Sequence, residues 1–321
     1  MNGGADARRI GLITNPLSRA LREGRFGLGA GAAGLPQAAP ASRAELRAAL
    51  SDFAAEGVNL LAVQGGDGTL REVLTALPGT FGDPPPEIAI LATGKTNLAA
   101  RVLGSPGPGG TALARLRDAA GRGTLRRKVL PVLDVARPGM GDAGPLRGLL
   151  FGAAAFTEAK LLAERALHRR GIHDGLAVLL ALGGVALRAG MQRGHPLRAG
   201  VPMQVAPDDR PALPGHRFLL LATSLDQLML GLWPFWEGGE GPLRWLDVAA
   251  PPKRLAAALW AARQGRPAPW MPAAGYRSGR AHRLAANLRD PFVLDGEVFD
   301  PGPDGLVLSA PGQVAFVTPD A

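Results

Sequence analysis

The first part of the chain alternates short apolar runs with amphipathic runs, a pattern typical of alternating strands and helices. Residues 10–14, 58–63 and 87–91 are apolar and short enough to be buried strands. Helices are predicted between and after them, at residues 42–56, 70–77, 98–103 and 111–121. Ser42 and Glu45 form a capping box at the start of the first helix. This alternation predicts an α/β domain with a parallel sheet.

The pattern changes after about residue 125. Strand-like runs then follow at short intervals, at residues 128–136, 146–151, 203–205, 217–223, 246–248, 276–278, 282–284, 292–294, 305–308 and 313–317. Two helical stretches are inserted, at residues 156–168 and 176–188. Closely spaced strands with turns between them indicate a mostly antiparallel, sandwich-like domain. We therefore expect an α/β domain at residues 1–125 and a β-rich domain at residues 126–321, whose last residues can pack back on the first domain.

A glycine-rich loop follows the second predicted strand and opens a helix. It consists of Gly65, Gly66, Asp67, Gly68 and Thr69. Glycine lets the backbone approach a ligand closely, and the free amides of a helix N-terminus suit a phosphate. A carboxylate such as Asp67 fits beside a phosphate when a Mg²⁺ ion lies between the two negative charges. The loop therefore predicts a Mg-nucleotide site with Asp67 as the metal-facing acid; a plain strand-to-helix turn is the alternative.

A second loop follows the third predicted strand and also opens a helix. It consists of Gly94, Lys95, Thr96 and Asn97. The carboxyl ends of neighbouring parallel strands form the crevice in which α/β proteins bind ligands, so we expect this loop to lie beside the first. Lys95 can supply positive charge to a phosphate, although a solvated lysine is the alternative interpretation.

Composition and charge narrow the class of protein. Hydrophobic residues make up 46% and charged residues 20% of the 321 positions, which is typical of a globular chain with a large core. The chain has no cysteine, which excludes disulfides and thiolate ligands. Its net charge of +9 favours anionic partners: nucleotide phosphates, anionic lipid surfaces or nucleic acid. Nucleic acid is disfavoured, because the basic residues are scattered and no tract interleaves them with aromatic residues.

Several features bear on membranes and metals. The longest apolar stretch, residues 176–187, is about half as long as a spanning helix needs, and no signal-peptide pattern is present, so a cytoplasmic protein is expected. The aromatic run at residues 232–236 predicts either core packing or a rim that touches lipid. The five histidines show no paired metal-ligand spacing.

Five sequence pieces occur in an order that resembles the diacylglycerol kinase catalytic family, which includes bacterial lipid kinases and sphingosine kinases. The pieces are Asn15-Pro16-Leu17-Ser18, the Gly65–Thr69 loop followed by Glu72, the Gly94–Asn97 loop, Gly152 after an apolar run, and Leu294-Asp295-Gly296-Glu297. The resemblance extends from residue 10 to residue 317. It implies an α/β nucleotide-binding domain followed by a β-rich domain, with the active site in the cleft between them.

The resemblance also implies a reaction, the transfer of the γ-phosphoryl group of ATP to a lipid hydroxyl. The residues implied to hold ATP are Asn15, Pro16, Ser18, Glu72 and both glycine loops, with Asp67 acting through Mg²⁺. Asp295 is expected to be the general base and Glu297 to support the metal network. Alternate residues of a regular strand share a face, so both acids can point into one site. Asp-Gly is also a strong hairpin signal, and a simple turn is the alternative.

The chain departs from the usual family motifs at a few positions. Arg19 stands where the first motif has glycine, Lys95 and Leu98 replace a threonine and an aspartate of the second loop, and an acidic turn is reduced to Gly239-Glu240-Gly241. We expect a lipid kinase that associates peripherally with an anionic membrane surface and phosphorylates diacylglycerol or a similar lipid alcohol. An NAD kinase and a non-catalytic nucleotide- or lipid-binding protein are the alternatives. The oligomeric state is left open, a homodimer included.

Overall fold

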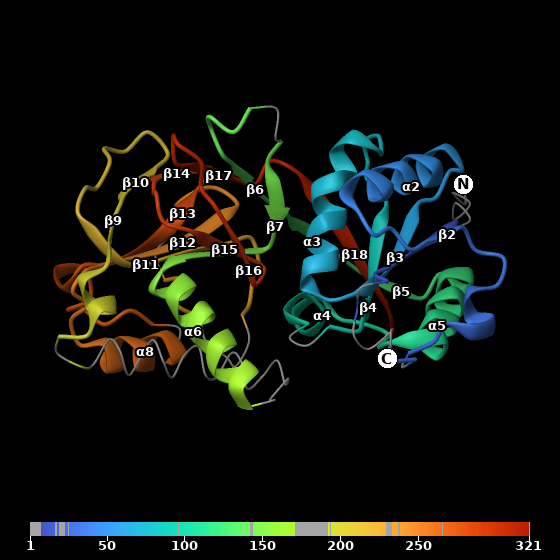
Figure 1. Ribbon diagram of the computed structural model, residues 1–321, viewed down its shortest axis with the longest axis horizontal. Helices are drawn as coiled ribbons and strands as arrows, with labels where there is room; N and C mark the ends of the chain where they lie inside the picture. Colours follow the sequence, from blue (N-terminus) through green and yellow to red (C-terminus); the bar gives the residue numbers. More distant parts are fainter. Residues whose placement is uncertain are drawn as a thin grey trace. The chain divides into compact units, whose positions relative to one another are not determined.

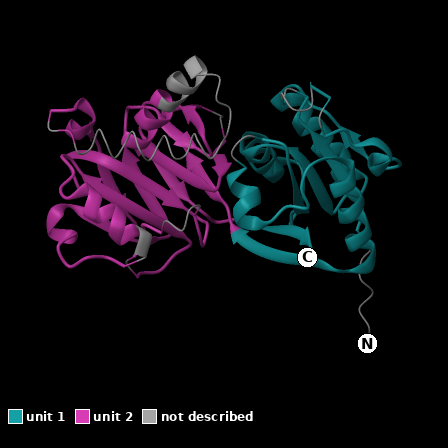
Figure 2. Cartoon of the chain, turned by 90° about the horizontal axis from the view of Figure 1, so that it is seen from below, with its two compact units in different colours: residues 1–130, 313–321 teal, residues 131–312 magenta. Residues whose placement is uncertain are grey.

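The computed structural model divides the chain into two compact units (Figure 2). Unit 1 comprises Met1–Leu130 and Gln313–Ala321, and unit 2 comprises Pro131–Gly312. The structure describes residues 8–16, 18, 23–24, 26–94, 97–141, 144–170, 192, 194–228, 233–236, 238–264 and 266–320. The division falls a few residues after the boundary expected from the sequence, and the last strand belongs to unit 1.

Unit 1 is built on a six-stranded sheet with the order β2-β1-β3-β4-β18-β5 (Figure 1). Its strands are β1 (Ile10–Thr14), β2 (Gln37–Ala38), β3 (Leu60–Gly65), β4 (Glu87–Ala92), β5 (Leu125–Pro131) and β18 (Gln313–Pro319). The pairs β1–β2, β1–β3, β3–β4 and β4–β18 are parallel. The carboxyl ends of β1, β3 and β4 therefore lie at one edge of the sheet, as the sequence predicted.

Four α-helices belong to the described part of unit 1. They are α2 (Arg43–Ala55), α3 (Asp67–Ala76), α4 (Leu98–Leu103) and α5 (Gly109–Arg122), with short 3-10 turns at Gly29–Ala32 and Leu77–Gly79. The predicted cap of α2 is confirmed, because the Ser42 side chain accepts a hydrogen bond from the amide of Glu45. Leu113 and Leu116 of α5 pack against Leu12 and Leu60 of the sheet. This core fixes the sheet edge from which the glycine loops project.

Unit 2 contains two antiparallel sheets that share one core. The smaller sheet has the order β10-β14-β17-β6-β7, and the larger has the order β13-β12-β11-β8-β15-β16, with β9 paired to β11. The strands are β6 (Leu133–Ala136), β7 (Leu146–Gly148), β8 (Leu150–Ala154), β9 (Val201–Pro202), β10 (Gln204–Pro207), β11 (His216–Thr223), β12 (Leu243–Ala249), β13 (Tyr276–Ala281), β14 (Arg283–Asn287), β15 (Phe292–Leu294), β16 (Glu297–Phe299) and β17 (Leu306–Ser309). Alternate residues of both sheets, such as Leu220 and Leu308, meet in the core, so unit 2 is a β-sandwich.

The opposite face of the larger sheet carries the described helices of unit 2 (Figure 1). These are α6 (Ala155–Arg170) and α8 (Leu255–Gln264), with 3-10 turns at Pro196–Ala199 and Pro272–Ala274. Leu246 and Val248 of β12 pack with Ala258 and Ala261 of α8 in a second apolar cluster. Helix α6 was predicted and α8 was not. The helix predicted at residues 176–188 lies outside the described residues.

The predicted fold class, an α/β domain with a parallel sheet followed by a β-rich domain, is confirmed. The single strand predicted at residues 128–136 is wrong, because this stretch contains the two strands β5 and β6 in different units. Within the described ranges, no helix is long and apolar enough to cross a membrane.

A buried ion pair network lies inside the larger sheet of unit 2. Asp247 of β12 is fully buried and pairs with Arg217 at 3.1 Å and with Arg277. Burial raises the pKa of the Asp247 carboxyl, and the two positive charges only partly oppose that effect. Removing the carboxylate would leave Arg217, itself buried, without its partner.

We predict that Asp247→Ala lowers the free energy of unfolding of unit 2 by about 3–5 kcal/mol, the cost of an uncompensated buried charge. All five tryptophans lie in unit 2, so urea unfolding followed by tryptophan fluorescence reports this unit alone. Asp209→Ala, at an exposed turn of the same unit, should change stability by less than about 0.5 kcal/mol. Equal effects of the two variants would contradict the role given to this network.

Candidate functional site

The two predicted glycine loops lie side by side at the carboxyl edge of the parallel sheet. Thr93 donates its amide to the carbonyl of Gly65 at 3.0 Å, which joins the end of β4 to the end of β3. Asn15 donates its amide to the carbonyl of Gln64 at 3.1 Å, which adds the end of β1. Three segments that are distant in sequence thus begin the site together, as parallel pairing requires.

Glycine is needed where the two loops touch. A Cβ atom added to Gly94 would lie 2.5 Å from the Cα atom of Gly66, and one added to Gly66 would lie 3.0 Å from the Cα atom of Gly94. Because backbone atoms cannot move aside as a flexible side chain can, any larger residue would push the loops apart. This contact gives both glycines a physical reason that the sequence alone did not reveal.

Side chains tie the first loop to β1. Asn15 donates its side-chain amide to the Thr69 hydroxyl at 2.9 Å. A Cβ atom on Gly65 would lie 2.4 Å from Thr69, so Gly65 leaves the space that Thr69 occupies. Ser18 donates its amide to the carbonyl of Asn15 at 3.1 Å and thereby closes a turn that contains Pro16. The structure therefore brings together the Asn15 motif and the first glycine loop.

Asp67 links the first loop to the helix that follows the second. Its carboxylate accepts hydrogen bonds from the amides of Leu98 and Ala99, both at 3.0 Å, at the start of α4. Asn97 precedes them in a left-handed conformation with φ 49°, and its side-chain amide donates to the carbonyl of Gly94 at 2.7 Å. Asp67 thus caps α4 from a distance in sequence, a role that was not predicted.

The environment of Asp67 has a clear electrostatic consequence. Burial raises the pKa of its carboxyl, and the amide hydrogen bonds, which favour the charged form, offset that rise only in part. Asp67 is therefore a desolvated acid that backbone donors hold in one orientation. A desolvated carboxylate interacts more strongly with a nearby cation than an exposed one does.

The N-terminus of α3 can receive a phosphate. Its N-cap residue is Gly66, and no side chain caps the helix there. The ten-residue length of α3 gives its first amides an electropositive character. No cluster of three acidic, histidine or cysteine side chains occurs among the described residues, so a divalent ion here would be held by Asp67 together with nucleotide phosphates. The residues present fit that arrangement, since Mg²⁺ commonly uses only one or two carboxylates plus phosphate oxygens.

Glu72 has different partners from those expected. Its carboxylate accepts two hydrogen bonds from Arg43 of α2, at 2.8 Å and 2.9 Å, and one from the buried Arg71 at 2.8 Å. Burial tends to raise the pKa of Glu72, but the hydrogen bonds and charges of both arginines outweigh it, and the pKa falls below its usual value. Glu72 thus joins α3 to α2, and its place among the residues that hold ATP stays a prediction.

The expected geometry at Asp295 and Glu297 is wrong. Leu294 pairs with Glu297 across the ladder, so Asp295 and Gly296, with φ 48° and 83°, form a two-residue hairpin turn between β15 and β16. The regular strand that would have put both acids on one face is absent at this point. This segment is therefore the simple turn that the Asp-Gly pair also predicted.

Asp295 still performs a specific task within unit 2. Its carboxylate accepts hydrogen bonds from the amides of Leu149 and Leu150, at 2.8–3.1 Å. A Cβ atom on Gly148 would lie 2.5 Å from this carboxylate, so the β7–β8 connection is fitted closely around it. Gly152 has a packing role, because a Cβ atom there would lie 2.3 Å from the Phe156 ring. Glu297 is exposed.

Other predicted residues are placed as follows. Lys95 and Thr96, together with Arg19, lie outside the described residues. Within the aromatic run, Phe235 is buried. Trp233 and Trp236 are partly buried and pack against the apolar cluster that α8 forms with β12, here called the α8 cluster. The core-packing alternative therefore describes this run, and the lipid-touching alternative is not supported there.

Comparison with known proteins agrees with this geometry. Residues 37–124 match the diacylglycerol kinase catalytic domain family. The matched segment contains both glycine loops and Asp67, and the resemblance drawn from the motifs is thereby confirmed. Asn15, Asp295 and Glu297 lie outside it.

The fold of the chain is also that of solved diacylglycerol kinase structures. Three structures from Bacillus anthracis str. Sterne superpose on the chain with TM-scores of 0.62, 0.59 and 0.58. All three are named as diacylglycerol kinases, the first two only provisionally. Each is 14% identical to this chain, and each comparison covers 97% of both chains. At this identity the likeness establishes the fold. No curated protein matches the chain.

The backbone donors of the site could not be identified from the sequence. The amides of Leu98 and Ala99 hold Asp67, and the amide of Thr93 joins the loops. The identity of a residue does not reveal which hydrogen bonds its backbone amide makes. The only available signal was a helix predicted to begin immediately after the second loop, since its first amides need an acceptor.

We predict that Gly94→Ala weakens ATP binding by at least about tenfold, because the added methyl group separates the two loops. Gly121→Ala is the matched control, since a Cβ atom there meets nothing within 4 Å. Equilibrium dialysis with labelled ATP measures both variants. Unchanged binding by Gly94→Ala would show that the contact between the loops does not shape the nucleotide site.

Proposed function

We propose that the chain is an ATP-dependent lipid kinase that transfers the γ-phosphoryl group to the hydroxyl of diacylglycerol or a similar long-chain lipid alcohol. The main support is the juxtaposition of the two glycine loops around Asp67, inside the segment that matches the diacylglycerol kinase catalytic domain. Phosphoryl transfer depends on positioning and charge neutralisation more than on covalent catalysis, and this site offers both.

In this proposal unit 1 binds the nucleotide. The uncapped start of α3 and the loops from Gly65 to Thr69 and from Gly94 to Asn97 receive the phosphates, with Asn15, Pro16 and Ser18 at their border. Asp67 holds the magnesium ion that accompanies ATP. When bound, that ion supplies positive charge to the phosphate oxygens.

The acceptor hydroxyl needs a group that removes its proton. Asp295 remains our candidate for this base and Glu297 for its support, although the hairpin turn changes the geometry first expected of them. Asp295 is oriented by two backbone amides, which fixes the direction of its carboxylate within unit 2. Charge-assisted hydrogen bonds of this kind are strong enough to preorganise an acid.

We predict phosphoryl transfer from γ-labelled ATP to an extracted lipid mixture that contains diacylglycerol, and none to NAD. The same assay without an acceptor measures hydrolysis. Transfer to NAD alone would identify an NAD kinase, and the absence of transfer with intact ATP binding would identify a binding protein. Either result would contradict the proposed function.

We predict that Asp67→Asn lowers transfer by about 100-fold or more, the usual scale for losing one preorganised electrostatic group. The overall fold should be retained, because the asparagine amide is nearly isosteric with the carboxylate. Its single oxygen can accept from only one of the two amides of Leu98 and Ala99, so a modest fall in the melting temperature is expected. Circular dichroism and thermal unfolding check the fold.

Asp118→Asn is the charge-matched control for this variant, because Asp118 is 60% exposed in its ion pair with Arg122 on α5. It should leave transfer unchanged. A fully active Asp67→Asn protein would show that the role given to Asp67 is incorrect.

A further inference from the structure

Helix α8 of unit 2 has the reverse of the usual distribution of residues. Its buried residues are Ala258, Ala261 and Ala262, and Leu255 packs beside them partly buried. Its outward side carries the larger apolar residues, with Leu259 37% exposed and Trp260 63% exposed. Surface helices normally bury their large apolar side chains and expose polar ones, so packing among the described residues does not explain this outward face.

The exposure of Trp260 stands out within the described residues. The other exposed large hydrophobic side chains there, Phe26, Val129 and Met140, reach 39–41% and are far apart in sequence. Leu259 and Trp260 instead adjoin the exposed Ala256 and Ala257 on the same helix. Residues 255–262 include no polar side chain, and the outward face is therefore continuous and apolar.

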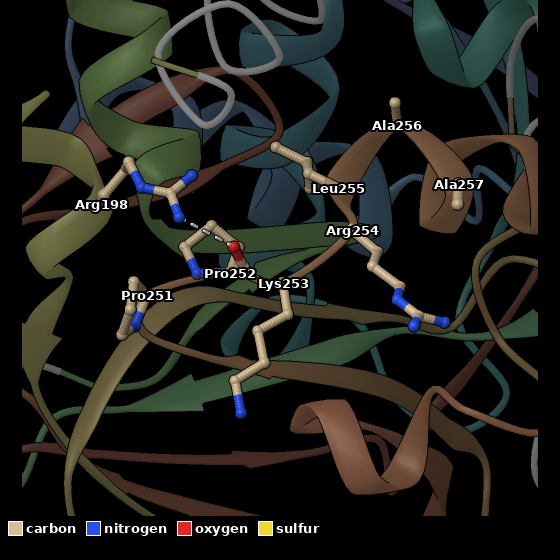
Figure 3. A pocket seen from close by; sticks show the side chains of 8 residues that line it. All are labelled: Arg198, Pro251, Pro252, Lys253, Arg254, Leu255, Ala256 and Ala257. Carbon is tan, nitrogen blue, oxygen red and sulfur yellow. Dashed lines mark hydrogen bonds between the residues drawn. The ribbon is translucent and has the colours of Figure 1, made fainter. Parts of the chain in front are cut away.

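Positive charge surrounds the start of this helix. A hollow of about 460 Å³ is lined by Arg198, Pro251, Pro252, Lys253, Arg254, Leu255, Ala256 and Ala257 (Figure 3). Three of these residues are cationic and none is acidic, and the first turn of α8 also has no acid.

Two contacts orient the cations of the hollow. Arg198 donates to the carbonyl of Pro252 at 3.2 Å, and the guanidinium of Arg254 lies 5.4 Å from the centre of the Trp270 ring. The Lys253 side chain extends away from the helix, as Figure 3 shows. An apolar face and a cationic hollow thus adjoin on one helix.

We propose that the α8 surface, defined as Lys253, Arg254, Ala256, Leu259 and Trp260, docks on an anionic phospholipid bilayer. Tryptophan favours the boundary between headgroups and acyl chains, and a helix with an apolar face and a cationic border lies in that boundary plane. Anionic headgroups complement the cationic hollow, whereas a neutral apolar partner would not.

This inference rests on the proposed function, because a lipid kinase must reach a substrate held in a bilayer and therefore needs a surface that binds one. Docking itself requires no phosphoryl transfer. It also needs no spanning helix, and none occurs in the described part of the chain.

Vesicle co-sedimentation without nucleotide tests the proposal. The full chain should bind phosphatidylcholine vesicles that contain phosphatidylglycerol, should bind pure phosphatidylcholine vesicles at least about tenfold more weakly, and should lose affinity as salt is added. Tryptophan emission should shift to shorter wavelength on binding, and Trp260→Phe should remove that shift. Equal binding to both vesicle types, or no binding, would overturn the proposal.

Matched variants test whether vesicle binding depends on the α8 surface or is nonspecific adsorption. Leu259→Ala with Trp260→Ala, and Lys253→Glu with Arg254→Glu, should each weaken binding to anionic vesicles by about tenfold or more. Met140→Ala and Arg210→Glu, at other exposed positions of unit 2, should not change it. If the α8 variants bind anionic vesicles as well as the wild-type chain does, the proposal is overturned. It is also overturned if the wild-type chain binds no vesicles but forms a dimer that these variants dissociate.

Transfer to detergent-solubilised lipid distinguishes this proposal from the proposed function. The α8 variants should keep wild-type transfer in detergent micelles and lose it on anionic vesicles. If the wild-type chain binds anionic vesicles through α8 but transfers nothing in micelles, the kinase proposal fails and the docking proposal stands.

Discussion

The site in unit 1 depends on one partly buried carboxylate, that of Asp67. Asp67 begins α3 and accepts the first amides of α4, so a single side chain fixes the spacing of two helices that follow different strands. Hydrogen bonds to a charged group contribute about 1.5–3 kcal/mol each, and burial of the charge opposes them and raises the pKa of the carboxyl. The two hydrogen bonds fix the position of the Asp67 carboxylate relative to α4. The contact between Gly66 and Gly94 is possible only while that spacing is kept.

The same device recurs in unit 2, where aspartates accept pairs of backbone amides. Asp295 holds Leu149 and Leu150 at a strand junction, and Asp208 accepts from the amides of His282 and Arg283 at 2.8 Å and 2.9 Å. An aspartate in a loop can thus have a structural role, as an acceptor for backbone amides, without any catalytic role. For Asp67 and Asp295 the two roles are compatible, because an acid held by amides is also an oriented acid.

Most of the fold of unit 1 could be predicted because its signals are local. Residues 10–14 and 98–103 coincide with β1 and α4, and the cap at Ser42 has the predicted partner. The break at Val132 could not be predicted, because β5 and β6 read as one continuous strand and separate only through their different sheets. Helix α8 was missed because an alanine-rich run without polar residues lacks the amphipathic period that marks a surface helix.

The candidate site was predictable in its residue types and not in its contacts. The glycines and Asp67 were identified from their sequence pattern. Asp295-Gly296 allowed both a strand and a hairpin interpretation, and the left-handed conformation of Asp295 in the structure decides for the hairpin. The lipid-contact hypothesis chose the tryptophans at 233 and 236, which the α8 cluster partly covers, over Trp260, which it leaves exposed. Burial of an aromatic residue is a tertiary property that a single sequence does not encode locally.

The central claim is that the two glycine loops and Asp67 form one site for a nucleotide accompanied by magnesium. Isothermal titration calorimetry of the wild-type chain with ATP tests it most directly, in the presence of magnesium and again after chelation. We expect saturable heat with a stoichiometry of about one in magnesium and much weaker binding after chelation. No heat under either condition would contradict the account.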